Sequence, residues 1–188
     1  MRPINELVDE LRDPDGRGWM PYVAPVHGGV NARVLSILRD PGPKTQDGTG
    51  SGYLCIENDD ATAEQQYLAF QTAGIDVHDL MPWNAYPWYI NRKPTAAELD
   101  AGVEPLVRLL DLLPRLTVVL LQGGDARSTW HRLTRRRPDL VADRHLTVIG
   151  THHPGRQALW SADPAVREQR QQHRLDAYQQ VAGALCAR

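Results

Sequence analysis

Four short segments of this chain combine polar side chains with glycine or proline, and they contain the residues best suited to chemistry. The segments are residues 39–43 (RDPGP), 82–88 (PWNAYPW), 122–128 (QGGDARS) and 151–157 (THHPGRQ). A carboxylate such as Asp40 can orient a water molecule and stabilise a developing cation, as carboxylates do in glycosidic bond cleavage. A histidine such as His153 can donate to an anionic leaving group. Each also has an ordinary interpretation, because Asp40 could cap a turn and His153 could belong to a solvated loop.

The second segment places Asn84 among the aromatic residues Trp83, Tyr86, Trp88 and Tyr89. One side-chain amide offers both donors and an acceptor, which suits the edge of a nucleobase. Aromatic rings can stack on bases. The alternative is a packed surface loop with Asn84 in a turn.

The third segment has two adjacent glycines, Gly123 and Gly124, before a predicted helix. Backbone amides at such a turn can approach a phosphate, although the lysine and spaced glycines of a P-loop are missing. The alternative is close packing of strand and helix, with Asp125 as the N-cap. The basic residues 135–137 at the far end of this helix either interact with its dipole or contact phosphate.

A metal site is not predicted. His152 and His153 are adjacent, Asp40 is the one nearby candidate for a third ligand, and no HxxxH, HxH or HxD spacing occurs near them.

Composition is typical of an ordinary globular protein, with 41% hydrophobic and 23% charged residues among 188. This length predicts a single domain over residues 1–188. The formal net charge of −2 gives no global basic field, but nucleic-acid binding needs only one basic face. Two cysteines, Cys55 and Cys186, are too few for a disulfide framework or an iron–sulfur cluster. With no signal peptide or long apolar run, we expect a soluble, cytoplasmic monomer with no membrane partner.

Strands and helices alternate in the predicted order. We expect core strands over residues 32–38, 77–82, 115–122 and 145–150, and helices over 4–11, 62–73, from 95 onward, 125–137 and 163–185. This alternation predicts an α/β fold with a parallel sheet and helices on both faces. Ligands of such sheets bind outside the carboxyl ends of the strands, where all four polar segments fall.

Local signals define several helix ends. Thr62 with Gln65, and Thr95 with Glu98, match the capping-box pattern. Pro105 should bend or break the third helix. For the last helix, Asp163 is the predicted N-cap, with proline at the first helical position.

Taken together, the four segments resemble the motifs of the uracil-DNA glycosylase superfamily. Asp-Pro-Gly follows the first strand, Asn the second, a glycine turn the third and His-Pro the last, over residues 33–157. The resemblance implies a three-layer α/β/α sandwich around a four-stranded parallel sheet. It also implies hydrolysis of the N-glycosidic bond of uracil or another deaminated base flipped out of DNA, leaving an abasic site. This chemistry requires no metal or other cofactor, so the resemblance implies none.

The resemblance assigns roles to the matching residues. Asp40 would position the attacking water, and His153 would donate to the anion that develops on the base O2. The residues implied to bind the base are Tyr53, Asn84, Gly42 and Pro41. Tyr53 would stack on the base, and Asn84 would read the uracil edge. At Gly42 the family admits either a small residue or a pyrimidine-blocking aromatic. The residues implied to contact DNA are Gly123, Gly124, Gly155, Arg156, Gln157 and Lys44.

Several positions differ from the family pattern, and Gly124 and Ala126 fit the third motif only loosely. Leu38 stands where a glycine usually opens the first motif, and Gly155 where a serine usually follows His-Pro. With too few cysteines for an iron–sulfur cluster, the chain resembles an atypical branch. Two other functions remain open, a non-catalytic nucleic-acid or nucleobase-binding protein on the same fold and a small nucleoside or nucleotide hydrolase.

Overall fold

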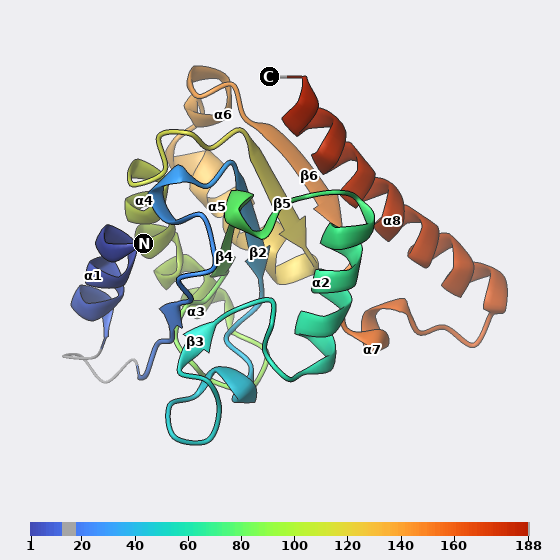
Figure 1. Cartoon of the computed structure of the whole chain (residues 1–188), viewed down its shortest axis with the longest axis horizontal. Coiled ribbons are helices and arrows are strands. Elements are labelled where there is room, and N and C mark those ends of the chain that lie inside the picture. The colour runs from blue at the N-terminus through green and yellow to red at the C-terminus, as the bar shows by residue number, and fades with distance from the viewer. Residues whose placement is uncertain (13–17, 188) are drawn as a thin grey trace.

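A computed structural model describes residues 1–12 and 18–187 of the chain. In this part of the chain, four parallel strands form the central sheet in the order β4-β2-β5-β6 (Figure 1). The strands are β2 (Val34–Leu38), β4 (Leu80–Asn84), β5 (Val118–Gln122) and β6 (Thr147–Thr151). A separate parallel pair joins β1 (Tyr22–Val23) to β3 (Tyr53–Leu54). The predicted α/β fold with a four-stranded parallel sheet is confirmed.

Helices cover both faces of this sheet and make it the middle layer of a sandwich. The α-helices are α1 (Arg2–Leu11), α2 (Ala61–Thr72), α3 (Ala96–Ala101), α4 (Val103–Asp111), α5 (Gly124–Arg136), α6 (Leu140–Asp143), α7 (Arg156–Leu159) and α8 (Pro164–Cys186). Short 3-10 turns are η1 (Gly29–Asn31), η2 (Pro43–Thr45) and η3 (Val77–Asp79). One hydrophobic cluster joins the sheet to α1, α3, α4 and α5, and the other joins it to α2 and α8 (Figure 1).

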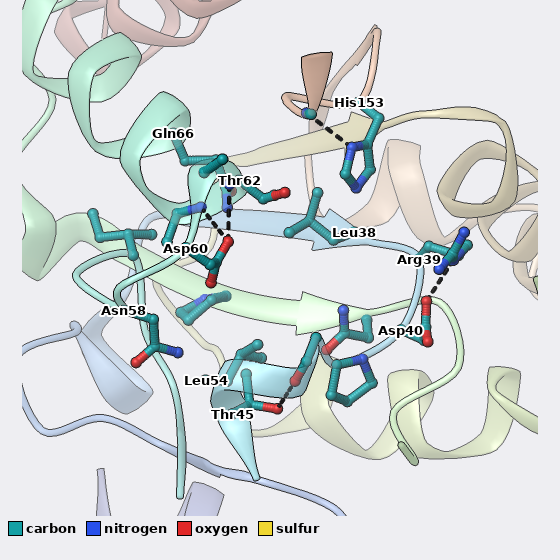
Figure 2. Close-up of a pocket in the computed structure, with 18 of the residues that line it drawn as sticks. Leu38, Arg39, Asp40, Thr45, Leu54, Asn58, Asp60, Thr62, Gln66 and His153 are labelled. Carbon is teal, nitrogen blue, oxygen red and sulfur yellow. Dashed lines mark hydrogen bonds and ion pairs between the residues drawn. The ribbon is translucent and has the colours of Figure 1, made fainter. Parts of the chain in front are cut away.

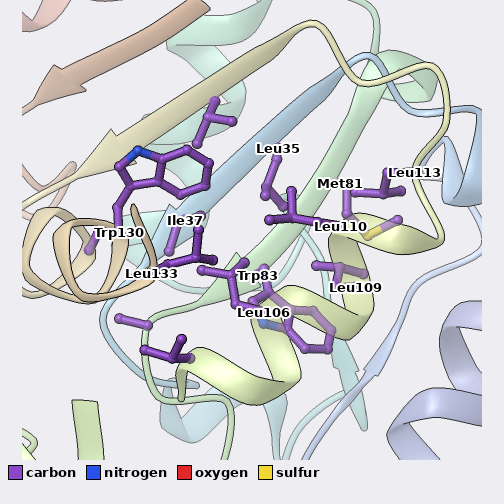
Figure 3. Close-up of a cluster of buried hydrophobic side chains, with 14 of the residues drawn as sticks. Leu35, Ile37, Met81, Trp83, Leu106, Leu109, Leu110, Leu113, Trp130 and Leu133 are labelled. Atoms are coloured by element: carbon purple, nitrogen blue, oxygen red, sulfur yellow. The ribbon is translucent and has the colours of Figure 1, made fainter. Parts of the chain in front are cut away.

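The alternation of side chains along each strand determines which residues enter each layer. In β2, Leu35 and Ile37 pack toward α4 and α5 (Figure 3), while Val34 packs toward α2 and α8. In β4, Met81 and Trp83 join the same cluster as Leu35. The residues between them therefore face α2 and α8, and at the carboxyl ends these include polar side chains.

The second strand differs from its predicted range. It begins at Leu80, because residues 77–79 form η3, with the Asp76 carboxylate accepting from the backbone N–H of His78 at 2.8 Å. The strand then runs on to Asn84. Asn84 is thus the last residue of a buried strand and not part of a turn.

One capping box was predicted wrongly and one is confirmed. The N-cap of α2 is Asp60, whose carboxylate accepts from the backbone N–H groups of Thr62 and Ala63 at 2.8 and 3.0 Å. Asp60 has extended backbone angles and is among the best N-cap residues, so the helix starts before Thr62 can cap it. The box of Thr95 and Glu98 is present in α3.

The predicted break in the third helix occurs at Gly102, between α3 and α4. Pro105 lies in the first turn of α4, where its missing N–H would have no helical acceptor. A Cβ at Gly102 would lie 1.9 Å from the carbonyl oxygen of Ala85. The glycine therefore lets the helix pass close to the segment after β4. Asp163 caps α8 as predicted, and none of the described helices is long and apolar enough to cross a membrane.

Candidate active site

A pocket of about 630 Å³ opens at the carboxyl ends of β2 and β4, on the side of the sheet covered by α2 (Figure 2). The chain leaves β2 toward α2 on one face and leaves β5 toward α5 on the other. The connections after the adjacent strands β2 and β5 therefore diverge, and α/β proteins bind ligands near such a point, at the carboxyl ends of the strands. The pocket lies on the β2 side of this point, against β4.

The pocket brings together most of the residues that the sequence singles out. Its walls include Asp40, Pro41, Gly42, Asn84, His153, Gly155, Arg156 and Gln157. These residues come from the ends of three different strands and lie up to 117 positions apart along the chain. Tyr53, Lys44, Gly123 and Gly124 do not line it.

Asn84 lies in the pocket wall with a side chain that is almost completely buried. It is 2% exposed, and among the described residues its amide nitrogen Nδ2 has no hydrogen-bond partner. A buried amide without a partner costs about 1–3 kcal/mol. Such a group in the wall of a pocket points to a ligand that supplies the missing acceptor.

His153 projects from the loop after β6 and is held in one tautomer. Its Nδ1 accepts a hydrogen bond from the backbone N–H of Gly155 at 3.0 Å, so the ring proton of the neutral form lies on Nε2. Burial, assisted by the positive charge of Arg39, lowers the pKa of His153 to about 4. The ring is therefore neutral at physiological pH and offers an N–H donor to the pocket.

Asp40 follows β2 and forms an ion pair with Arg39 (Figure 2). Its carboxyl side chain is only 4% exposed. Burial raises the pKa of Asp40, and the adjacent guanidinium of Arg39 opposes that rise. Both charged side chains lie in the pocket wall, across from Asp60 and Thr62 at the start of α2 (Figure 2).

Sequence reasoning missed a set of polar residues that line the deeper pocket. Gln122 donates from Nε2 to Ser36 at 2.7 Å and to Gln66 at 2.8 Å, and it accepts from the hydroxyl of Tyr178 at 2.6 Å. Ser36 and Gln66 line the pocket, as does Asp60, the N-cap of α2. A serine inside the apolar strand VLSIL was the available signal for this network.

The aromatic residues around Asn84 do not form a base-stacking loop. Trp83 and Trp88 are 1% and 0% exposed, and Tyr86 packs against Trp88 with ring centroids 5.1 Å apart. The alternation in β4 sends Trp83 into the core opposite Asn84. The rings of Trp83, Tyr86 and Trp88 are buried in the core cluster and support the strand end.

Tyr53 lies outside the pocket, although it was expected to stack on a base. It pairs with Tyr22 in the short sheet of β1 and β3, is 39% exposed, and its ring centroid is 6.4 Å from that of Tyr22. The next residue, Leu54, faces the pocket instead, together with Ile56. Alternation along the strand directs Tyr53 and Leu54 to opposite sides.

The glycine turn after β5 supports the loop of His153. The N-cap of α5 is Gly123, with φ of 101°, and not Asp125, which lies in the first turn. A Cβ added to Gly123 would lie 3.4 Å from the Cβ of His153. The turn thus packs behind the histidine. Lys44 is exposed, 4.0 Å from Asp59.

The described residues contain no cluster of three or more His, Cys, Asp or Glu side chains with the geometry of a metal site. His152 packs edge-on against His173 of α8, with ring centroids 5.2 Å apart.

In comparisons with known proteins, no family model matches the chain, and no curated protein is significantly similar to it.

Proposed function

We propose that this chain is a monofunctional DNA glycosylase that removes uracil or another deaminated base flipped out of DNA. The observation that carries the proposal is a pocket lined by Asn84, His153 and Asp40, in which the buried Nδ2 of Asn84 has no partner among the described residues and His153 is neutral. These three groups suit the three tasks of the reaction, which are reading the base, stabilising the departing anion and directing water.

Asn84 would select the base. The edge of uracil carries an acceptor at O4 and a donor at N3, and one amide can pair with both. The missing partner of Nδ2 would be supplied by O4. Leu54 and Ile56, which line the pocket, would contact the faces of the base in place of Tyr53.

His153 and Asp40 would carry the bond cleavage. As the C1′–N1 bond breaks, its electron pair moves to the base and negative charge develops on O2, while the sugar becomes cationic. The Nε2–H of His153 would donate a hydrogen bond to O2, and the charge of Asp40 would stabilise the sugar cation. A donor fixed before the reaction needs no reorganisation as charge develops.

Water would complete the hydrolysis. A water molecule held by Asp40 attacks C1′, and its proton passes to the carboxylate. The products are an abasic site in the DNA and the free base, which is protonated from solvent. No step calls for a cofactor.

An excision assay tests this function. Single- and double-stranded oligonucleotides containing uracil, hypoxanthine or xanthine are incubated with the protein, and abasic sites are scored by alkaline cleavage. Asp40→Asn and His153→Ala should each lower excision at least a hundredfold, on the order of the effect of one catalytic group. The exposed His131 on α5 provides a matched control, His131→Ala, which should excise normally.

The same assay separates the two alternatives. Absence of abasic product from all three bases in both strand forms would overturn the glycosylase proposal. Tight binding without product would favour a non-catalytic binding protein. Faster hydrolysis of free nucleosides than of oligonucleotides would favour a nucleoside hydrolase.

A further inference from the structure

A second hollow lies beside the candidate pocket, between α7 and α8. It has a volume of about 610 Å³, and Arg156 lines both it and the candidate pocket. The helix α7 leads directly from the loop of His153 to Trp160, which lies in the wall of this hollow. The two sites are therefore adjacent, with Arg156 in the wall of both and α7 between the His153 loop and Trp160.

Trp160 is unusual because of its exposure. It is 68% exposed, the highest value among the large hydrophobic side chains that the structure describes, whereas Trp83, Trp88 and Trp130 are at most 6% exposed. An exposed indole is a large apolar surface left in water. A flat ligand stacked on it would remove that surface from water.

In the part of the chain that the structure describes, the arginines around Trp160 have no acidic partners. In the described residues, no carboxylate oxygen lies within 4.0 Å of the side chains of Arg156, Arg167, Arg170 or Arg174. The lining of the hollow includes one acid, Glu168. The face is thus basic although the whole chain carries a formal net charge of −2.

Two of these arginines also fix the segment that carries the indole. Arg170 donates from Nη1 to the carbonyl oxygen of Trp160 at 2.6 Å, and Arg167 donates from Nη1 to that of Ser161 at 2.5 Å. Within the described residues, Nε and Nη2 of both guanidinium groups make no hydrogen bond, so these N–H groups can contact an anion. The indole is therefore presented on an anchored segment.

We propose that Trp160 and the arginines around it form a binding site for single-stranded nucleic acid that flanks the flipped base. An unpaired base would stack on the indole, and the phosphates beside it would contact Arg156 and Arg167. This inference rests on the proposed function, since the strand is the one whose base enters the adjacent pocket. Stacking requires an unpaired base, because the faces of paired bases are covered by their neighbours in a duplex.

Binding is tested apart from catalysis, by fluorescence anisotropy with a labelled, uracil-free single strand of about 12 nucleotides, within the range that such sites cover. Trp160→Ala should weaken binding about tenfold, the effect of losing one stacked base. Trp160→Phe keeps a stacking ring and should bind within about threefold of the wild type. Tryptophan emission of the wild type should fall on binding, and this quenching should be lost in Trp160→Phe.

Two further variants sharpen the test. Arg167→Ala should reduce the slope of log K against log salt by about 0.7, as expected for one lost phosphate contact with a single strand. Leu68→Ala removes another exposed apolar side chain, on α2, and should bind as the wild type does. Melting temperatures of all variants show whether they are folded.

Three results would overturn the inference. Trp160→Ala could bind the strand as tightly as the wild type does, or the wild type could bind a matched duplex as tightly as the single strand. In the third, polyglutamate would displace the labelled strand as effectively as unlabelled strand does. The last would indicate an acidic protein partner. If Trp160→Ala weakens binding but no oligonucleotide yields abasic sites, the strand site stands and the proposed glycosylase activity is wrong. If uracil is excised but Trp160→Ala binds normally, the glycosylase activity stands and the strand site at Trp160 is wrong.

Discussion

The backbone N–H of Gly155 donates to Nδ1 of His153 at 3.0 Å, and a Cβ at Gly155 would lie 3.0 Å from the same nitrogen. The two residues thus form a close turn in which the glycine sets the tautomer of the histidine and leaves room for its ring. A serine at this position, usual in the motif that the chain resembles, would press on the ring. The glycine is therefore explained by close packing against His153.

This contact predicts the effect of Gly155→Ala. The added methyl group must displace the His153 ring, which is held from behind by Gly123. Since small displacements of a catalytic group cost up to about a hundredfold, we expect excision to fall roughly ten- to a hundredfold. Single-turnover excision kinetics with uracil-containing DNA measure this. An unchanged rate would mean that the ring position does not matter.

The pH dependence of excision should reflect the neutral state of His153. Its pKa is lowered to about 4, and protonation at Nδ1 would replace the acceptor of the Gly155 N–H with a second donor. The rate should therefore show no inflection near the ordinary histidine pKa of about 6.5. It should fall only in more acidic solution, where His153 becomes protonated. A bell-shaped profile with its acid limb near pH 6.5 would contradict this.

The protein should also become less stable as the pH is lowered, because folding lowers the pKa of two histidines. Burial lowers the pKa of both His27 and His153 to about 4. The unfolded chain binds a proton near pH 6.5, whereas each folded site stays neutral until about pH 4, so acidification favours unfolding across this window. The loss is at most roughly 3 kcal/mol for each histidine. Urea unfolding of His27→Phe from pH 7 to 4.5 should give a flatter curve than the wild type; parallel curves would contradict the assignment.

Gly42→Phe should close the pocket without unfolding the protein. A Cβ at Gly42 meets no atom within 4 Å, and the residue has φ of −78°, which other residues adopt easily. The ring would occupy space that the base needs, so we expect excision to fall on the order of a hundredfold. Gly183→Phe, at an open position on α8, is the matched control. Full activity of Gly42→Phe with an unchanged melting temperature would place the base elsewhere.

Tyr178→Phe tests the buried polar network behind the pocket. The hydroxyl of Tyr178 donates to Oε1 of Gln122 at 2.6 Å, and both residues are buried. Its removal leaves a buried acceptor without a donor and should cost about 1–3 kcal/mol of unfolding free energy. Denaturant unfolding measures this, with Tyr67→Phe on the exposed side of α2 as a control that should change it by less than about 0.5 kcal/mol.

The positions of the main elements were predictable from local patterns. Apolar runs such as residues 118–122 form strands, and caps such as Asp163 define helix ends, because both depend on neighbours in sequence. The parallel order of strands and helices then required the polar segments to meet at one edge of the sheet. The meeting of Asp40, Asn84 and His153 in one pocket follows from that order.

Tertiary packing decided what local pattern could not. A shift of one residue in the register of β4 would exchange the faces of Trp83 and Asn84. Only the pairing of β4 with β2 sets that register. Likewise, the pairing of β3 with β1 turns Tyr53 outward and Leu54 inward. The neutrality of His153 depends on burial by segments distant in sequence. The sequence by itself determined which residue types reach the strand ends, and the folded structure decided which of them face the pocket, because side-chain direction and burial are properties of the assembled sheet.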